Sequence, residues 1–286
     1  KSVLLATGGF GYNKDLLSEE LQDVLYYGPV SSTGDGQLMA MEVGGQFELM
    51  NYGKMYPNGV EVASGIGKST IYGNLAAFGQ SGILVDKTGK RVVNERASNK
   101  AILTAQLAAE GKQLYLVMDA ATYEAFSGNL AKNSITQQDL SRWLENAGST
   151  PPLHVTGQTL EEVAELAGLD ATALAETVAR YNGFVQSGID EDWDRMPEFM
   201  TAEIGAGPYY IIEQKPRFAT TMGSAVVNES LQMLDAEGNV IPNLSAAGEM
   251  INGVHGDDSA PGATMGWALT SGRLAADAIV DAQGSE

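Results

Sequence analysis

Three short glycine-rich stretches of this sequence carry residue types that can hold a nucleotide. They are Ala6-Thr7-Gly8-Gly9-Phe10, Ser32-Thr33-Gly34-Asp35-Gly36, and a longer run from Ala246 to Gly266 with Glu249 near its start. Glycine adopts positive φ and lets a ligand approach the backbone closely. Free N–H groups at a helix start bind phosphate, and a carboxylate after a strand holds a pair of ribose hydroxyls. Each stretch alone is equally well explained as a tight turn, but the three together favour a ligand site.

Strands and helices are predicted on either side of these stretches. A strand covers residues 2–6, a helix follows Gly34-Asp35-Gly36 to about Val43, and a final helix runs from about Gly262 to Ala282. The dinucleotide fingerprint GxGxxG, in which a strand leads through glycines into a helix, is absent from the chain. The chain also begins inside a predicted strand, so we expect that residues preceding Lys1 have been lost.

The middle of the chain has a different character. Apolar periodicity and turn residues predict hairpins at 83–93 and 224–241, a strand at 113–118, helices at 160–166 and 171–185, and a loop at 186–208. The fold class is therefore α/β. We predict a discontinuous domain of residues 1–52 and 216–286, interrupted by an inserted α+β domain of residues 53–215.

Composition excludes several classes of function. The net charge of -19 repels nucleic-acid phosphates and anionic lipid, and no apolar stretch is long enough to span a membrane. The absence of cysteine excludes disulfides, iron–sulfur ligation and thiol catalysis, and two histidines are too few for a histidine-rich metal site. We therefore expect no metal site, no nucleic-acid partner and no membrane span.

The order of motifs resembles the FAD-dependent flavoprotein family of fumarate reductase and succinate dehydrogenase, with urocanate reductase, L-aspartate oxidase and 3-ketosteroid dehydrogenase as relatives. The matching pieces span nearly the whole chain. They are Ala6 to Phe10, Thr33 to Gly36, Tyr56-Pro57, Gly82 to Glu95, Pro208 to Tyr210, Thr221 to Gly223, Ala247 to Glu249, and Gly253 to Gly256.

This resemblance implies an incomplete Rossmann-like FAD-binding domain with an inserted capping domain, whose missing amino-terminal part carried GxGxxG. It implies that Glu249 binds the adenosine ribose. It also implies that the N–H groups at the start of the last helix face the flavin O2 edge and stabilise negative charge on it. The residues that the resemblance places at FAD are Thr7, Gly8, Gly9, Thr33, Gly34, Asp35, Gly248, Glu249, Gly262, Ala263, Thr264 and Met265.

The sequence departs from the family where a dicarboxylate would be held and protonated. The resemblance implies that fumarate reductases hold the two substrate carboxylates with arginines and place a histidine close by. The residues at the matching positions here are Tyr56, Leu75, Phe78, Asn99, Thr220 and Ser259.

Every one of these replacements removes charge or basicity. A small shift of alignment would let Arg96 replace the arginine lost at Asn99, but no arginine lies between Arg217 and Arg273 to replace the one lost at Ser259. We therefore expect a small uncharged or aromatic enone or enoate as substrate, and neither fumarate nor succinate.

Several polar side chains could supply the proton in such a reaction. A tyrosine can protonate a developing enolate, and we predict Tyr56, His255 and Ser259 as the catalytic residues. The other candidates are Tyr72, Asp257, Asp258 and Thr220. A purely structural interpretation remains open for each: a packed turn for Tyr56, an oriented loop for His255, a solvated loop for the aspartates.

Two groups of basic residues are expected to have no part in the chemistry. His154 is expected at the surface beside Pro151-Pro152, and the arginines and lysines of the 83–93 hairpin are expected to be solvated.

Two functions remain as hypotheses. The first is an oxidoreductase that reduces or forms a carbon–carbon double bond conjugated to a carbonyl, with an electron-donor protein or flavin domain as partner. The second is a catalytically inactive binding or assembly module that lacks half of its flavin domain. Because members of the resembled family are often bacterial and exported, the cell envelope is favoured over the cytoplasm.

Overall fold

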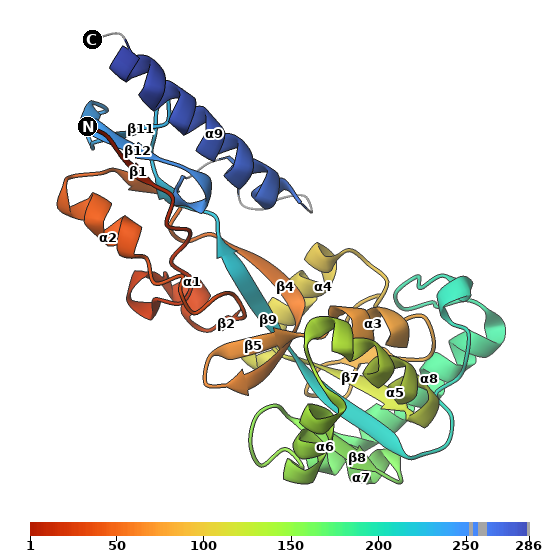
Figure 1. The fold of residues 1–286 in the computed structure, drawn as a ribbon. Coiled ribbons are helices and arrows are strands. Elements are labelled where there is room, and N and C mark those ends of the chain that lie inside the picture. Colours follow the sequence, from red (N-terminus) through yellow and green to blue (C-terminus); the bar gives the residue numbers. More distant parts are fainter. Residues whose placement is uncertain (252–253, 257–261, 285–286) are drawn as a thin grey trace. The chain divides into compact units, whose positions relative to one another are not determined.

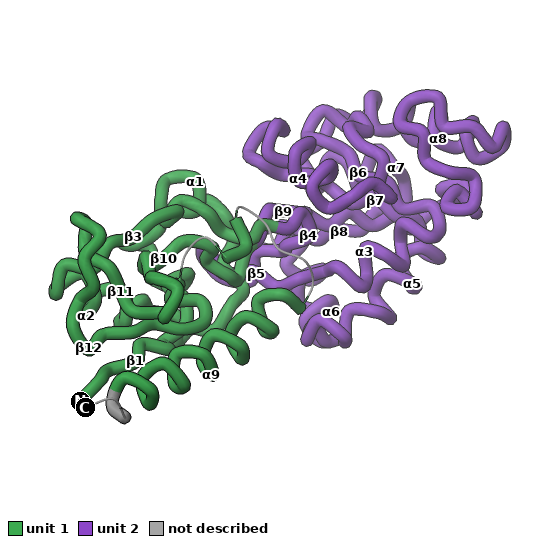
Figure 2. The backbone as a smooth tube through the Cα atoms, turned by 90° about the horizontal axis from the view of Figure 1, so that it is seen from above, with its two compact units in different colours: residues 1–55, 218–286 green, residues 56–217 purple. Residues whose placement is uncertain are grey.

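A computed structural model describes residues 1–251, 254–256 and 262–284. The chain divides into unit 1, residues Lys1–Met55 and Phe218–Glu286, and unit 2, residues Tyr56–Arg217 (Figure 2). Strands β4 (Gly53–Ala63) and β9 (Tyr209–Thr221) lead from one unit into the other. Each unit has its own core, and each is described by itself.

Unit 1 contains a small sheet with helices on both sides (Figure 1). Strand β1 (Val3–Leu5) pairs in parallel with β12 (Val240–Ala246), and β11 (Gln232–Leu234) pairs antiparallel with β12. Helices α2 (Asp35–Glu42) and α9 (Ala263–Gly284) each bury an alanine, Ala40 and Ala275, in the same apolar cluster as the sheet. The carboxyl ends of β1 and β12 therefore lie side by side, each followed by one of the predicted glycine junctions.

A second cluster in unit 1 surrounds Phe10 and Phe218. The remaining elements of this unit are short. They are η1 (Lys14–Leu16), α1 (Glu19–Gln22), β2 (Leu25–Tyr26), β3 (Phe47–Glu48), β10 (Ser224–Ala225) and η5 (Gly248–Met250).

Unit 2 is built on a sheet that is buried on both faces. In β7 (Leu114–Asp119), Tyr115 and Val117 enter one apolar cluster, while Leu116 and Met118 enter another. Successive side chains of a strand point to opposite faces, so a strand buried on both faces reads as a continuous apolar run. Helices α7 (Leu160–Ala167) and α8 (Ala171–Ser187) cover the first face.

The second face of this sheet is covered by helices that contribute Ala77, Ile102, Phe126 and Trp143 to its cluster. Those helices are α3 (Ile71–Ala77), α4 (Asn99–Ala108), α5 (Ala120–Asn129) and α6 (Gln137–Asn146). The other strands and short helices of unit 2 are β5 (Ile66–Ser69), β6 (Ile83–Val85), β8 (His154–Gly157), η2 (Glu110–Lys112), η3 (Leu130–Asn133) and η4 (Pro197–Phe199). The strand pairs β4–β5, β6–β7, β7–β9 and β8–β9 of this unit are antiparallel.

Three sequence expectations need correction. The predicted 224–241 hairpin turns at 235–238 as expected, but its arms are β11 and β12, because β10 pairs with β3 instead. Arg91 of the first hairpin is buried between Glu95 and Asp190 and is not solvated, because two carboxylates compensate its charge there. His154 is completely buried and does not lie at the surface.

No helix in the described part of the chain combines the length and the apolar character that crossing a membrane requires.

Candidate functional site

The predicted glycine junctions converge in unit 1 around Glu249. Its Oε1 accepts hydrogen bonds from the Thr221 backbone N–H (2.8 Å) and from the Thr221 hydroxyl (2.9 Å). Gly9 packs directly against this pair, since a Cβ at Gly9 would overlap Glu249 Oε1 and Thr221 Oγ1 and would lie 2.7 Å from Glu249 Cδ. Only glycine leaves room here for the carboxylate.

The Glu249 carboxylate keeps one oxygen available. Burial raises the pKa of Glu249, and the two hydrogen bonds from Thr221 oppose that rise by stabilising the charged form. Its Oε2 makes no hydrogen bond to any described residue. A half-buried carboxylate with one fixed and one available oxygen suits a ligand with hydroxyl groups.

The loop after β1 is held by the first turns of α2. Gln37, fully buried, donates from Nε2 to the Gly8 carbonyl at 2.9 Å and to the Ser224 hydroxyl at 3.3 Å. A Cβ at Gly36 would overlap the Thr7 hydroxyl, so Thr7 lies against the start of this helix. Gly8 itself has φ +79° and open space beside its Cα, as expected of backbone that a ligand approaches.

Thr33, Gly34 and Asp35 form the start of α2. Gly34 has φ +77° at the N-cap, and the Thr33 hydroxyl donates to Asp35 Oδ1 at 2.9 Å on the exposed side. The Asn13 side-chain amide donates to the Thr33 carbonyl at 2.9 Å, which ties this turn to the loop after β1. The structure thus brings the first two predicted junctions together.

The third junction is anchored by α9. The backbone N–H of Gly248 donates to the Ser271 hydroxyl at 2.8 Å, and this hydroxyl donates to the Trp267 carbonyl at 2.7 Å. Gly262, with φ +82°, precedes the helix, and Ala263, Thr264 and Met265 form its first turn. Among the described residues, no hydrogen bond joins Gly262–Met265 to Gly9, Thr221 or Glu249.

The predicted catalytic residues are not gathered in this cluster. Tyr56 is in unit 2, where its ring lies 4.9 Å from the Arg217 guanidinium carbon. His255 is half-buried in unit 1, and its Nε2 is buried without a partner among the described residues. Ser259 lies outside the described residues, as do Asp257 and Asp258. Tyr72 is exposed on α3, and Thr220 is half-buried in β9.

A cavity of about 140 Å³ lies inside unit 2. Its lining includes Pro57 of β4, Leu75 of α3 and Phe78 directly after it, Asn99 at the start of α4, and Arg96 in the loop that precedes α4. Leu75, Phe78 and Asn99 are three of the positions where the sequence departs from the dicarboxylate reductases, and Arg96 is the arginine beside them. The fold therefore collects in one cavity residues that were singled out separately along the chain.

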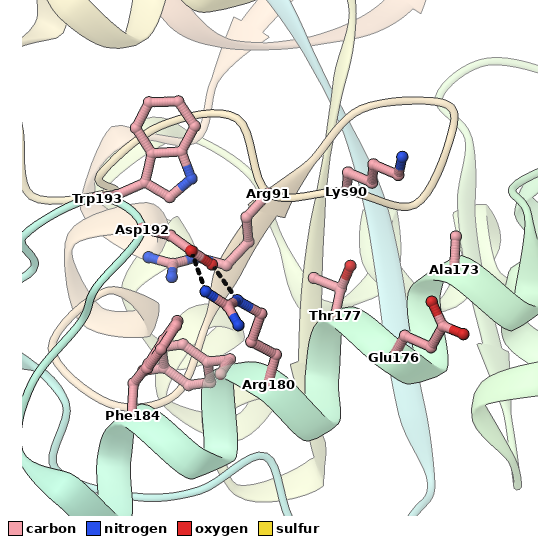
Figure 3. Close-up of a pocket in the computed structure, with 10 residues that line it drawn as sticks. Lys90, Arg91, Ala173, Glu176, Thr177, Arg180, Phe184, Asp192 and Trp193 are labelled. Atoms are coloured by element: carbon pink, nitrogen blue, oxygen red, sulfur yellow. Dashed lines mark hydrogen bonds and ion pairs between the residues drawn. The ribbon is translucent and has the colours of Figure 1, made fainter.

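A larger cavity of about 390 Å³ in unit 2 has different walls (Figure 3). Arg180 and Asp192 form a bidentate ion pair across it, at 2.7 and 2.6 Å, beside Trp193 and Phe184. None of the residues predicted from the sequence to bind or react lines this cavity. Its charged groups therefore give no indication of a reaction.

Three residues that hold the glycine junctions of unit 1 in place were not predicted from the sequence, namely Gln37, Thr221 and Ser271. Gln37 and Ser271 lie inside predicted helices, where their apolar surroundings gave no reason to single them out. Thr221 opens the Thr221-Met222-Gly223 motif that carried the resemblance, so its position was available as an indication.

Comparison with known proteins gives one consistent result. Residues 1–265 match the family described as FAD binding domain. The chain is 32% identical over 279 residues to a fumarate reductase (cytochrome) of Shewanella frigidimarina, covering 96% of this chain and 45% of that protein. It is 30% identical over 258 residues to the urocanate reductase of Eggerthella lenta, covering 87% and 39%.

Among solved structures, the open conformation of a flavocytochrome c3 fumarate reductase superposes with a TM-score of 0.70 at 29% identity, over 97% of this chain and 46% of that one. The chain thus spans less than half the length of these relatives.

Proposed function

The chain belongs to the FAD-binding domain family of flavoproteins, as its motifs predicted, and from this premise we propose that unit 1 holds FAD in a protein that reduces or forms a conjugated carbon–carbon double bond. The observation that carries the proposal is the Gly9–Glu249–Thr221 cluster. It supplies a carboxylate for hydroxyl groups directly beside Gly9, a position where any Cβ would overlap that carboxylate.

The residues present fit FAD. Glu249 Oε2 would accept from the adenosine ribose, and the open backbone at Gly8 would lie against the cofactor. The N–H groups at the start of α9, from Gly262 to Met265, would face the electron-rich edge of the flavin. Unit 1 would then be part of a Rossmann-like domain, and unit 2 the capping domain that holds substrate.

Bound FAD would supply hydride exchange with the β-carbon of the substrate. The protein would bind and orient the conjugated carbonyl and move the second proton. Tyr56 is the proposed proton donor, with His255 and Ser259 as the other proposed reacting groups. The cavity in unit 2, with walls from Leu75, Phe78 and Ile102, would exclude water from the alkene. An electron-donor protein or flavin domain would supply the electrons.

The test is reoxidation of the reduced flavin. The chain loaded with FAD and reduced anaerobically should be reoxidised by small conjugated enones and enoates, and not by their saturated analogues. Fumarate should be a slower oxidant than a one-carboxylate enoate, because the clamp residues for its second carboxylate are absent. Stopped-flow absorbance measures both rates, and fumarate as the fastest oxidant would contradict the proposal.

A second function is favoured by one observation. Helix α9 exposes apolar side chains along its length: Met265, Leu269, Leu274 and Val280 are 68%, 71%, 50% and 66% exposed. At about 3.6 residues per turn, Met265, Leu269 and Val280 fall on one side of this helix, and exposed apolar residues gathered on one side are typical of a binding surface. The chain would then act as an assembly module, and failure to retain FAD alone would favour this function over the first.

A further inference from the structure

The smaller cavity of unit 2 has the size of a small organic ligand. Its volume of about 140 Å³ is close to that of an engineered cavity of roughly 150 Å³ that binds benzene. Leu75, Phe78 and Ile102 give it apolar walls. A ligand of a few carbon atoms therefore fits inside, whereas a larger molecule would place only one end there.

The two charged residues that line this cavity differ in their surroundings. Glu95 is buried and neutralised, since its Oε2 lies 2.8 Å from Arg91 Nη2 and 3.1 Å from Arg195 Nη1. Arg96 has no ion pair with any described residue, and its guanidinium stacks on the Phe199 ring at 4.0 Å from the centroid. The cavity thus presents one positive charge whose counter-ion the described chain does not supply.

Arg96 is held in a fixed place. Its stacking on Phe199 is a cation–π contact, which restrains the planar guanidinium. The Phe199 carbonyl in turn accepts from Arg195 Nε at 3.0 Å, and Arg195 also donates to the Phe78 carbonyl at 2.8 Å. One buried arginine therefore positions both the platform of Arg96 and an apolar wall of the cavity.

We propose that this cavity binds the carboxylate of a small monoanionic enoate through Arg96, with the alkenyl tail against Leu75, Phe78 and Ile102. The enoate part of this inference rests on the function proposed above. A guanidinium binds carboxylate bidentately, which fixes orientation as well as adding energy. A second carboxylate would meet the apolar walls, Glu95 or the uncharged amides of Asn58, Asn74 and Asn99, and it would lose hydration without a second cation in the lining to pair with.

This assignment changes the expectation drawn from the sequence. Asn99, at the position of a family arginine, indicated an uncharged pocket. Arg96 lines the same cavity three residues earlier and restores a single positive charge there. The structure therefore favours a charged enoate over an uncharged enone as the preferred ligand.

The test measures binding of three probes to the full chain by ligand-observed NMR or calorimetry. Crotonate should bind at least about tenfold more tightly than its neutral analogue crotonamide, which corresponds to about 1.4 kcal/mol, and more tightly than the dicarboxylate fumarate. Arg96→Gln should remove the difference between crotonate and crotonamide. Arg96→Lys should restore part of this difference, because an ammonium keeps the positive charge but cannot bind the carboxylate bidentately.

Arg142→Gln is the matched control, since this exposed arginine lies on α6 of the same unit. It should leave all three affinities unchanged. Crotonate affinity that is absent, or that Arg96→Gln leaves intact, overturns the proposal, and so does tighter binding of fumarate. Because binding is measured without flavin, its failure is distinct from a failure of the flavin to turn over.

Discussion

Substituting Arg195 by methionine should lower the free energy of unfolding by about 3–5 kcal/mol, the typical cost of breaking a buried ion pair. The Arg195 side chain is fully buried and its Nη1 lies 3.1 Å from Glu95 Oε2. It also donates to the carbonyls of Phe78, Gly82 and Phe199 at 2.8, 2.9 and 3.0 Å. Methionine would fill similar space but would leave these acceptors buried without a donor.

The charges in this cluster explain why the loss should be large. Arg91 and Arg195 balance Glu95 and Asp190, so removal of one arginine leaves an excess negative charge in the interior. Arg180→Met is the matched control, because Arg180 forms its ion pair with Asp192 on the exposed surface of the same unit. Urea denaturation measures both variants, and a loss for Arg195→Met no greater than that for Arg180→Met would contradict this account.

Replacing His154 by phenylalanine should weaken the dependence of stability on acid pH. His154 is completely buried beside the rings of Tyr123 and Trp143, at centroid distances of 5.5 and 6.5 Å. Burial lowers the pKa of His154 from 6.5 to about 3, because the charged form loses its hydration. Tyr123 is the titratable group facing it, and burial raises the pKa of that phenol.

The sign follows from proton uptake in the two states. Below pH 6.5 the unfolded chain protonates His154 while the folded chain does not until about pH 3. The stability contributed by neutral His154 is therefore complete above pH 6.5 and is lost as pH falls, by about 1.4 kcal/mol for each unit.

Denaturation curves at pH 6.5 and at about pH 4.5 measure the effect. His154→Phe should lose about 2 kcal/mol less between these values than the unmodified chain. Tyr123→Phe, which keeps the imidazole, should retain the full acid dependence. Equal losses for His154→Phe and the unmodified chain would show that the imidazole is protonated in the folded state as readily as in the unfolded one.

The sequence predicted what depends on local pattern. Glycine junctions after strands located Gly8, Gly9 and Gly34, because positive φ and close packing exclude other residues there. Helices α7 and α8 were predicted at 160–166 and 171–185 from their apolar periodicity. In the structure the Thr159 hydroxyl and the Asp170 carboxylate, just before them, accept the N-cap hydrogen bonds from the Glu162 and Ala173 backbone N–H groups.

What depends on distant partners could not be predicted in the same way. The sequence neighbours of Arg91 and His154 contain no partner that would indicate burial, and only the folded chain places Asp190 beside Arg91 and Trp143 beside His154. The sequence did not show whether Arg96 or Asn99 faces a pocket, because the two residues are only three positions apart around the start of α4. The structure places both in the lining of one cavity. Helix α6 was missed although Thr136 and Asp139 form a capping box, because no element was predicted between the strand at 113–118 and the helix at 160–166.

The central claim is that unit 1 forms an FAD cradle around Gly9 and Glu249, and the visible spectrum of the chain tests it most directly. After incubation with excess FAD and desalting, the unmodified chain should keep a flavin absorbance band. Gly272→Ala, in an open position of α9, should keep it too, while Gly9→Ala should lose it because the added Cβ displaces the Glu249 carboxylate. A colourless unmodified chain, or a Gly9→Ala chain that keeps as much flavin as Gly272→Ala, would contradict the account.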